Sequence, residues 1–188
     1  MFQLHNVIPD IVTIGKPMGN GYPVAAVVCK RHIADVFAST GIEYFNTFGG
    51  NSVACYIADA VLDTIINEKL QENALIVGKY LKEKLTILMG QYPCIVDVRG
   101  CGLFLGVEFV SQMNGGSLST TNKGEWGPDG LESCCLFTKR IIDHMQQHAC
   151  VIASRDDNVM KIKPPLVFGH KEAAILLGAL ENALSCCV

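Results

Sequence analysis

The apolar positions of this chain follow two different periods, and each period predicts one type of secondary structure. A short β-branched run covers residues 11–14, and a second one covers residues 24–29. The first run, followed by Gly and Pro, predicts a buried strand, and a glycine-rich loop joins it to a second strand. A short helix over residues 31–38 and a loop over residues 39–48 are expected to follow.

Two longer stretches change to a helical period. Residues 52–67 carry apolar side chains at i, i+3 and i+4 spacing, which predicts an amphipathic helix. Residues 69–89 repeat this pattern with a charged opposite face. The apolar face consists of Leu70, Ala74, Val77, Leu81, Leu85 and Leu88, and the charged face of Lys79, Lys82, Glu83 and Lys84. The simplest interpretation is two helices that face a core and leave their charges in solvent.

The second half of the chain mixes both periods. Its expected elements are two strands over 95–110 with a break at 100–102, a loop over 111–130 that holds Trp126, a helix over 131–148, strands over 151–153 and 159–162, and a closing helix over 171–184. Arg99 is the charged residue at the break. We interpret it as a structural salt bridge rather than as a substrate contact.

Composition places the chain among globular proteins with a substantial core. Of its 188 residues, 49% are hydrophobic and 18% are charged, and the net charge is −3. This charge gives no electrostatic reason to expect a nucleic-acid partner. No apolar run approaches the length of a membrane span, and the N-terminus lacks the features of a signal peptide or a mitochondrial presequence.

The nine cysteines and five histidines predict no metal site. No two cysteines are spaced C-x-x-C, and their odd number favours buried free thiols in a reducing compartment. Prenylation needs a cysteine four residues from the end, where Ser185 stands. His144 and His148 would share one helix face, but they lack an obvious third ligand, so we expect surface histidines.

Lys16 is the first candidate for chemistry. It stands between the first apolar run and a break formed by Gly15, Pro17, Gly19 and Gly21. Pro17 disfavours the helical region for the residue before it, so we expect Lys16 to be extended at the strand end and poorly solvated. Poor solvation lowers the pKa of a lysine and suits it to a Schiff base with a carbonyl compound. The alternative is an ordinary solvated lysine.

Thr47 is the second candidate. It precedes Gly49-Gly50-Asn51, and the helix over 52–67 starts directly afterwards. A hydroxyl, two glycines and a helix N-terminus form a site for an anion, because backbone N–H groups and the helix dipole point there. A turn with a helix cap explains the same residues. A lysine for an aldehyde and a site for a phosphate together suggest pyridoxal phosphate.

The string IVTIGKPMGNGYPVAAV, followed by EYFNTFGGN, resembles the class III aminotransferase family, which has fold type I of the pyridoxal-phosphate enzymes. Within the family it is most similar to the alanine–glyoxylate aminotransferase 2-like subgroup, which includes ammonio phospho-lyases. The later strings DVRGCGLFLGVEFV and MKIKPPLVF occur in the family's order. The resemblance therefore covers nearly the whole chain.

The resemblance implies an α/β fold, in which the tail of a large, mostly parallel-sheet domain precedes a small α+β domain. We expect a remnant of the large cofactor-binding domain over residues 1–78 and a small C-terminal domain over residues 79–188. By the same resemblance, Lys16 carries pyridoxal phosphate as a Schiff base. Thr47 binds the cofactor phosphate of the partner subunit in a homodimer, and the substrate is a small-molecule amine.

Lys161 departs from the family pattern. Many class III aminotransferases have an arginine three residues before the first proline of this segment, where it holds the substrate α-carboxylate, but here the segment reads MKIKPPL. A lysine is a point charge and a weaker clamp for a carboxylate. The departure resembles the phospho-lyases, whose substrates are phosphorylated amines such as phosphoethanolamine or 5-phosphohydroxylysine. Alternation of Lys161 and Lys163 along an exposed strand edge is equally open.

By comparison with the family, Met1 falls in the middle of the large domain. The family's aspartate on the pyridine nitrogen, its phosphate-binding loop and its ring-stacking aromatic residue would then lie upstream, as would any targeting segment. The compartment, mitochondrial or cytoplasmic, therefore stays open. Three functions are compatible with the sequence: a transaminase, a phospho-lyase that releases phosphate and ammonia, and a catalytically inactive fragment.

Overall fold

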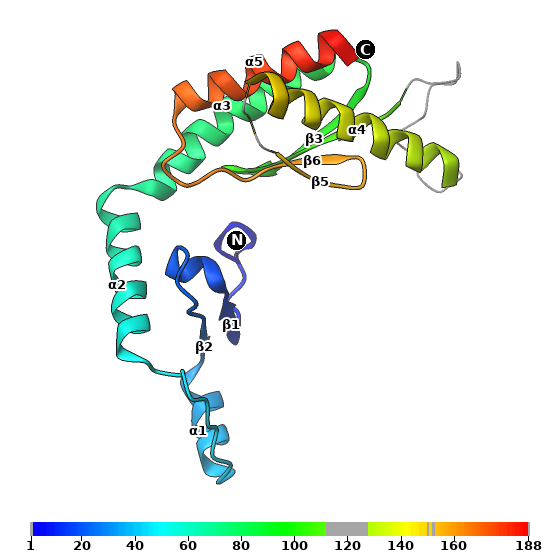
Figure 1. Ribbon diagram of the computed structural model, residues 1–188. Coiled ribbons are helices and arrows are strands. Elements are labelled where there is room, and N and C mark those ends of the chain that lie inside the picture. Colours follow the sequence, from blue (N-terminus) through cyan, green and yellow to red (C-terminus); the bar gives the residue numbers. More distant parts are fainter. Residues whose placement is uncertain (1, 112–127, 150, 152, 188) are drawn as a thin grey trace. The chain divides into compact units, whose positions relative to one another are not determined.

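A computed structural model describes residues 2–111, 128–149, 151 and 153–187. The chain forms two compact units, Met1–Lys69 and Leu70–Val188 (Figure 1). The boundary expected from the sequence, between residues 78 and 79, falls inside helix α3 (Leu70–Gln91). The units divide at the start of that helix instead, because its apolar face packs into the core of unit 2.

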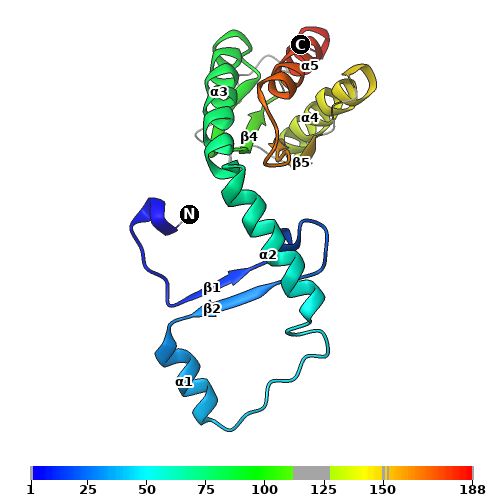
Figure 2. The same ribbon diagram turned by 90° about the vertical axis from the view of Figure 1, so that its left-hand side faces the viewer.

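The described part of unit 1 consists of two strands, two α-helices and two short 3-10 helices. In chain order they are η1 (Phe2–His5), β1 (Ile11–Ile14), η2 (Lys16–Gly19), β2 (Ala26–Cys29), α1 (Arg31–Ser39) and α2 (Ser52–Asn67). β1 and β2 pair antiparallel, with Ile11 opposite Cys29 and Ile14 opposite Ala26 (Figure 2). The described residues therefore contain no parallel pair from the large sheet that the resemblance implies.

The first strand of unit 1 was expected to be buried, and for the described residues this expectation is wrong. The exposed fraction is 53% for Ile11 and 68% for Val27. A two-stranded ribbon leaves its faces open unless a second layer covers them. Burial in unit 1 occurs where η2 packs against α2, at Gly19, Ala54 and Ala58.

The described part of unit 2 is a four-stranded antiparallel sheet with three helices. Its elements are α3, β3 (Ile95–Cys101), β4 (Phe104–Phe109), α4 (Pro128–Ala149), β5 (Ser154–Asp156), β6 (Val159–Ile162) and α5 (His170–Cys187), and the strand order is β3-β4-β6-β5. Of the break expected at 100–102, Gly100 and Cys101 belong to the end of β3, and Gly102 begins the turn to β4. The strand expected over 151–153 is found three residues later, as β5. Most of the expected loop, with Trp126, lies outside the described residues.

Helices α3, α4 and α5 cover one face of this sheet (Figure 1). The core between them includes Val77, Leu81, Leu85, Val107, Phe109, Ile141, Met145, Met160 and Leu180. This confirms the apolar face that was predicted for residues 69–89. α3 approaches the β3–β4 turn so closely that a Cβ on Gly78 would lie 2.1 Å from the carbonyl oxygen of Gly102.

The cysteines were expected to be buried free thiols, and the structure bears out only part of this expectation. The cysteines that the structure describes are free thiols, but of these only Cys94 and Cys134 are buried. On α4, the ring centroids of His144 and His148 lie 4.2 Å apart. No group of three or more potential metal ligands occurs within the described ranges. No helix in those ranges combines the length and the apolar character of a membrane span.

Candidate functional site

Lys16 lies in the connection between β1 and β2, as the first residue of η2. Two backbone hydrogen bonds close this turn, from the N–H of Met18 to the oxygen of Gly15 and from the N–H of Asn20 to the oxygen of Pro17, each at 3.1 Å. The locked φ of Pro17 suits the second position of such a turn. The expectation that Lys16 is extended at the strand end is therefore wrong.

The side chain of Lys16 is exposed. The poor solvation expected from the sequence is absent from the described structure, because the short ribbon of β1 and β2 is itself largely exposed. An exposed primary amine can still condense with an aldehyde. The structure of this chain thus leaves the Schiff-base role of Lys16 as a prediction.

Close packing fixes the turn that carries Lys16. A Cβ on Gly19 would lie 2.6 Å from Cγ1 of Val24, so the loop closes only around a glycine. Asn20 follows with a φ of +45°, a conformation that asparagine tolerates better than most residues. η2 also packs against α2, where the small side chain of Ala58 is buried. Lys16 therefore projects from a well-anchored base.

Thr47 lies in the turn directly before α2, and its side chain is exposed. Asn51 caps the helix, since its Oδ1 accepts hydrogen bonds from the N–H groups of Val53 and Ala54 at 3.0 and 3.1 Å. Gly50 has a φ of +70°, which favours glycine. A turn with a helix cap is therefore confirmed, and the anion site stays a prediction.

Some N–H groups near Thr47 are used within the turn itself. The N–H of Gly49, for example, donates to the backbone oxygen of Asn46 at 3.0 Å. Within the described residues, no internal acceptor is found for the N–H groups of Gly50 and Ser52. These two donors and the Thr47 hydroxyl are the groups that an anion could use at this end of α2.

The two candidates occupy separate turns of unit 1. Lys16 stands between β1 and β2, whereas Thr47 stands between α1 and α2. The described hydrogen bonds and ion pairs do not join the two side chains. This separation agrees with the implied arrangement in which the threonine of one subunit serves the cofactor of another, but it does not test it.

Lys161 lies in β6, between β4 and β5, so the interpretation as an exposed strand edge is wrong. Gly106 and Ser154 stand opposite it on the neighbouring strands. The Lys161 side chain is half-buried, and its Nζ lies 2.7 Å from Oδ2 of Asp156. The hydrogen bond from Lys161, and then its charge, hold the pKa of the Asp156 carboxyl below its usual value.

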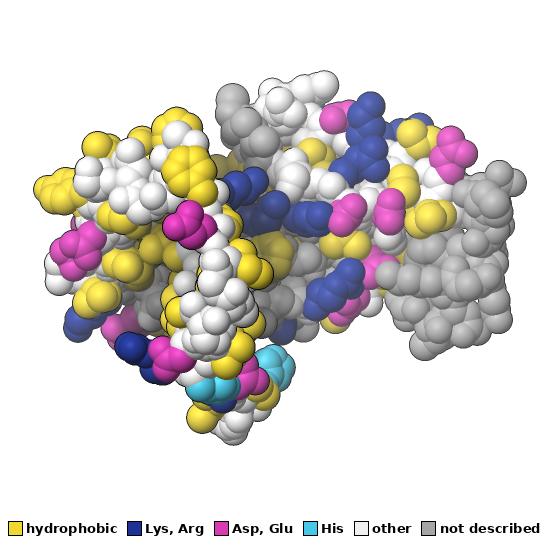
Figure 3. Space-filling model, turned by 90° about the horizontal axis from the view of Figure 1, so that it is seen from below, with side chains coloured by type: hydrophobic (Ala, Val, Ile, Leu, Met, Phe, Trp, Pro, Cys, Tyr) yellow, Lys and Arg dark blue, Asp and Glu magenta, His cyan; other side chains and the backbone are white. Residues whose placement is uncertain are grey.

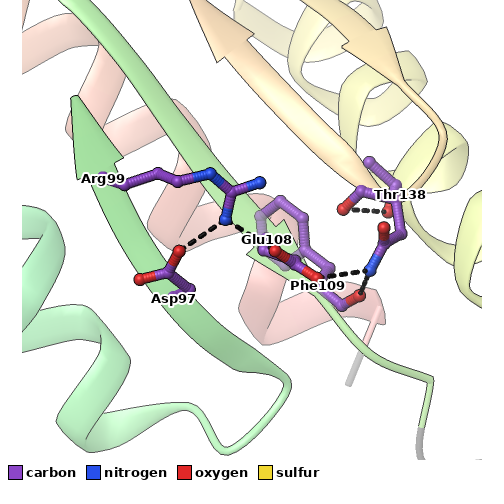
Figure 4. A network of polar contacts seen from close by, with 6 residues as sticks. Asp97, Arg99, Glu108, Phe109 and Thr138 are labelled. Carbon is purple, nitrogen blue, oxygen red and sulfur yellow. Dashed lines mark hydrogen bonds and ion pairs between the residues drawn. The ribbon is translucent and has the colours of Figure 1, made fainter. Parts of the chain in front are cut away.

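Arg99 joins two strands through a pair of carboxylates (Figure 4). Its Nη1 donates to Asp97 on its own strand and to Oε2 of Glu108 on β4, the latter at 2.6 Å. Glu108 is only 3% exposed, and the hydrogen bonds that the guanidinium donates to Glu108 and then to Asp97 raise the pKa of Arg99. Nδ2 of Asn158 extends the network by donating to the backbone oxygen of Phe109 at 2.7 Å. The salt-bridge interpretation of Arg99 is confirmed.

Sequence reasoning missed the acidic and amide members of this network. The available signal was that Glu108 stands within an apolar run, which indicates a buried position. A buried carboxylate needs a cationic or hydrogen-bonding partner, so a partner such as Arg99 could have been sought. Asn158 gave no such signal, since an asparagine near Asp157 is equally typical of an exposed turn. Its burial follows from the return of β6 beside β4.

A pocket of about 510 Å³ in unit 2 was missed as well. Its walls are mainly apolar and come from α4, β6 and α5, and Lys161, Lys163 and Glu172 are its charged members. These segments are far apart in the sequence and meet only in the folded unit. Lys161 therefore borders this pocket, and along β6 it alternates with the buried residues Met160 and Ile162.

Comparison with known proteins decides the family. The model of the class III aminotransferases matches residues 1–184. The chain belongs to this family. The resemblance found in the sequence is thereby confirmed, and the strings that carry Lys16, Thr47 and Lys161 all fall inside the matched region.

Individual relatives agree with this assignment. The chain is 45% identical over 186 residues to alanine–glyoxylate aminotransferase 2 homolog 2, mitochondrial, of Arabidopsis thaliana, and this match covers 98% of the chain and 35% of the relative. An Arthrobacter phospholyase, solved in complex with phosphoethanolamine, is 37% identical with a TM-score of 0.84, and the match covers 98% of this chain and 40% of that one. A PLP-bound amine transaminase from an uncultivated Pseudomonas species has 30% identity and a TM-score of 0.81, with 99% and 40% covered.

The structural neighbours confirm the α/β fold of a class III transaminase, of which this chain forms the C-terminal part. The chain spans about a third of the length of the curated relatives, 34% and 35% for two of them. Transaminases and a phospholyase both occur among its similar proteins. The similarity therefore establishes the family and leaves the reaction to be argued from the residues.

Proposed function

We propose that this chain supplies the Schiff-base lysine and a phosphate-binding threonine of a pyridoxal-phosphate-dependent transaminase. The observation that carries the proposal is the position of Lys16, whose exposed amine projects from the tightly packed η2 turn within a family-matched segment. The PLP-bound transaminase of the same fold supports this choice of cofactor. The substrate would be a small-molecule amine.

The residues of unit 1 fit such a cofactor in chemical type. The primary amine of Lys16 suits an aldehyde, and the Thr47 hydroxyl with the N–H groups of Gly50 and Ser52 suits a phosphate. When bound, pyridoxal phosphate supplies an electron sink for the carbon next to the amine. Nζ of Lys16 would hold the cofactor and, once released, would accept the proton from the substrate Cα.

We further propose a homodimer in which Thr47 contributes to the site of the partner subunit. Thr47 is surrounded in sequence by large apolar side chains that this chain leaves exposed, among them Tyr44, Phe45 and Phe48. Phe45 is 84% exposed and Phe48 is 80% exposed. A cluster of exposed aromatic residues marks a protein–protein contact surface. Such a contact would bring the Thr47 turn to a neighbouring cofactor.

Phospho-lyase chemistry is the second candidate for the same site. The favouring observation is Lys161, which replaces the usual arginine and stands in a chain 37% identical to a phospholyase. A lysine suits a phosphate better than it suits the bidentate grip of a carboxylate. In that reaction Lys16 would again accept the Cα proton, and phosphate would leave from the neighbouring carbon.

A catalytically inactive product is the alternative outside enzyme chemistry. The extensive exposure of apolar side chains in unit 1, including both strands, is the observation that favours it. Proteins with large exposed apolar patches tend to associate. Under this alternative the chain would pair with other subunits without binding a cofactor.

The proposal is tested by trapping the cofactor on the lysine. The chain is incubated with pyridoxal phosphate, reduced with borohydride, digested, and analysed by mass spectrometry. We expect the pyridoxyl group on the peptide that contains Lys16. Lys69, an exposed lysine of the same unit, is the internal control. Equal labelling of Lys69 and Lys16, or unchanged total labelling in Lys16→Arg, would overturn the proposal.

The reaction is then assigned by its products. Chain that has been loaded with pyridoxal phosphate, and not reduced, is incubated either with alanine and glyoxylate or with phosphoethanolamine. Formation of pyruvate supports the transaminase, and release of inorganic phosphate supports the phospho-lyase. If Lys16 stays unlabelled and neither product forms, the inactive alternative holds.

A further inference from the structure

Asn20 and Gly21 form an exposed asparagine–glycine pair in the turn that carries Lys16. Asn20 directly follows η2, and its N–H donates to the backbone oxygen of Pro17 at 3.1 Å. Few of the described residues of unit 1 are buried, and many of its exposed side chains are hydrophobic; side chains of this kind are seen in yellow on the surface in Figure 3. The turn with Asn20 and Gly21 is therefore open to solvent.

The backbone nitrogen of Gly21 is not held by any contact that the structure describes. The N–H groups on either side donate hydrogen bonds, from Asn20 to Pro17 and from Tyr22 to Gly19 at 3.0 Å. Among the described residues, no acceptor is found for the N–H of Gly21 itself. Nothing lies within 4 Å of a Cβ built on this glycine. The nitrogen is therefore available to react with a neighbouring group.

The side-chain amide of Asn20 is also without a hydrogen bond in the described part of the chain. Other asparagines of unit 1 are engaged. The side chain of Asn51 caps α2, and Oδ1 of Asn46 accepts the N–H of Phe48 at 3.1 Å. The amide carbon of Asn20, Cγ, is an electrophile that forms a five-membered ring when the nitrogen of the next residue attacks it. Asn20 therefore places a free electrophile beside the free nitrogen of Gly21.

One bond rotation separates the folded turn from the geometry that reacts. Asn20 has a φ of +45° and a ψ of +46°, and this ψ directs the nitrogen of Gly21 away from Cγ. Rotation about the Cα–C bond of Asn20 brings the two atoms together and opens the hydrogen bond from Tyr22 to Gly19. Gly21, which has a φ of +108°, adapts to this rotation because a glycine has no Cβ to clash. Local opening of one exposed hydrogen bond is frequent in folded proteins.

The chemistry open to this pair is deamidation. The nitrogen of Gly21 bonds to Cγ of Asn20, its proton passes through solvent to the amide nitrogen, and ammonia leaves a five-membered succinimide. Water then adds to one of the two ring carbonyls. Opening at Cγ gives aspartate with the original backbone, whereas opening at the main-chain carbon gives isoaspartate, in which the backbone runs through the side chain. Water is the only reactant added and ammonia the only product lost.

Isoaspartate would change the turn that carries Lys16, because it lengthens the main chain by one atom. The turn has no room for this atom at its base, since a Cβ on Gly19 would already lie 2.6 Å from Cγ1 of Val24. The new carboxylate also stands next to the hydrogen bond from Asn20 to Pro17 that closes the turn. Lys16 would then project from a different base.

We propose that Asn20 is a self-modification site, at which attack by Gly21 produces aspartate and isoaspartate, and that the isoaspartate form loses the turn geometry that presents Lys16. The modification itself does not depend on the proposed function. Only its effect on cofactor binding rests on that function, because this effect assumes that Lys16 carries pyridoxal phosphate. The chain would thus lose its cofactor site with age.

Tryptic peptide mapping tests the modification. Trypsin does not cleave before proline, so Lys16, Asn20 and Asn6 stay together on the peptide of residues 1–30. The folded chain is aged in mildly alkaline buffer, and fragmentation of this peptide locates each conversion of an amide to an acid. Asn6 is the matched control, because it is exposed and has a φ of +52° but precedes Val7. We expect Asn20 to convert on the order of tenfold faster than Asn6, since the side chain of Val7 hinders ring closure.

Isoaspartate is measured with protein isoaspartyl methyltransferase, which adds a labelled methyl group to it. Label on the 1–30 peptide should accumulate with age in the parent chain and stay at background in Asn20→Gln, whose longer side chain closes the ring far more slowly. Asn114, outside the described residues, also precedes a glycine, and ageing continues until it has converted. Retention of Asn20 at that point, or equal rates for Asn20 and Asn6, would overturn the proposal.

The effect on Lys16 is read from the same peptide. Aged chain is loaded with pyridoxal phosphate and reduced with borohydride, and the pyridoxyl group is quantified on the chromatographically separated asparagine, aspartate and isoaspartate forms. We expect the isoaspartate form to lose most of the label that the asparagine form carries, and Asn20→Asp, which has a normal backbone, to keep it. Equal label on all forms would overturn the effect on Lys16. Absence of label from every form would contradict the proposed function, whereas the modification is still judged by its rate.

Discussion

The Arg99 guanidinium lies 2.6 Å from the carboxylate of Glu108, a residue of β4 that is only 3% exposed. A buried charge that loses its partner is costly, whereas an exposed pair contributes little. We therefore expect Arg99→Ala to lower the free energy of unfolding by about 3 kcal/mol. Asp97→Ala, which removes the half-exposed partner of the same arginine, should lower it by less than about 1 kcal/mol.

Urea denaturation of the two variants and the parent chain measures this difference. A double-mutant cycle with Glu108→Gln isolates the pair from the rest of the network. If Arg99→Ala and Asp97→Ala destabilise the chain equally, the buried carboxylate is not the partner that matters.

Two glycines of α3 should respond in opposite directions to alanine. At Gly78 a Cβ would meet the backbone of Gly102 at 2.1 Å, so Gly78→Ala must push the helix away from the β3–β4 turn. We expect it to destabilise unit 2 by about 2 kcal/mol or more. At Gly90 nothing lies within 4 Å of the added Cβ, so Gly90→Ala should stabilise by about 0.5 kcal/mol through helix propensity. Thermal unfolding of both variants measures the change in stability relative to the parent chain. A change in the same direction for both variants would contradict the prediction.

Cys94 should be far less reactive than the exposed thiols. Burial raises its pKa to about 11, so the thiol stays protonated at neutral pH, and the thiolate is the reactive form. Iodoacetamide at pH 8 should label Cys55 and Cys101 in the folded chain and label Cys94 only after unfolding. Peptide mass spectrometry provides the measurement. Labelling of Cys94 at the rate of Cys55 would show that the core around it opens readily.

The ion pair between Lys161 and Asp156 should make the folded chain less stable at acidic pH. The lysine lowers the pKa of the carboxyl in the folded chain. The pair therefore contributes its stability above the unfolded carboxyl's pKa, and this contribution is lost as the pH falls through the lower folded value. Carboxyl titration by NMR should give a pKa for Asp156 that rises toward the ordinary value in Lys161→Gln. An unchanged pKa in that variant would remove the basis of the effect.

The N-cap of α2 should control the local stability of the helix that follows Thr47. Asn51→Ala removes the acceptor for the N–H groups of Val53 and Ala54 and should cost about 1 kcal/mol. Hydrogen exchange at Val53 and Ala54 should then become about fivefold faster, while Asn51→Asp, which keeps the acceptor, should preserve protection. Equal exchange in both variants would show that the cap does not hold this end of the helix.

The helices were predictable from local pattern alone. α2 begins and ends where the sequence placed it, because Asn51 is a strong N-cap and the apolar spacing continues to Ile66, one residue before the helix ends. The apolar face of α3 was also read correctly, since its leucines recur at helical spacing and are buried in the core. Both signals act over a few residues and need no distant partner.

The two strands of unit 1 were found where the sequence placed them, but the first strand is not buried as predicted. Val27 and Ile11 have the composition of covered strands, yet both are exposed. Burial depends on a second layer that packs against the strand, and a strand's own composition cannot supply that layer. For the same reason, the solvation of Lys16 could not be inferred from the apolar run that precedes it.

The sequence by itself determined the family, the helices and the capped turn that carries Thr47, because motifs, capping residues and periodicity are properties of neighbouring residues. Only the tertiary structure decided that Glu108 is buried against Arg99 and that Gly106 separates Arg99 from Lys161. These relationships depend on the register and order of strands from distant parts of the chain. Strand pairing of that kind is set by the packing of the whole sheet and not by the residues of any one strand.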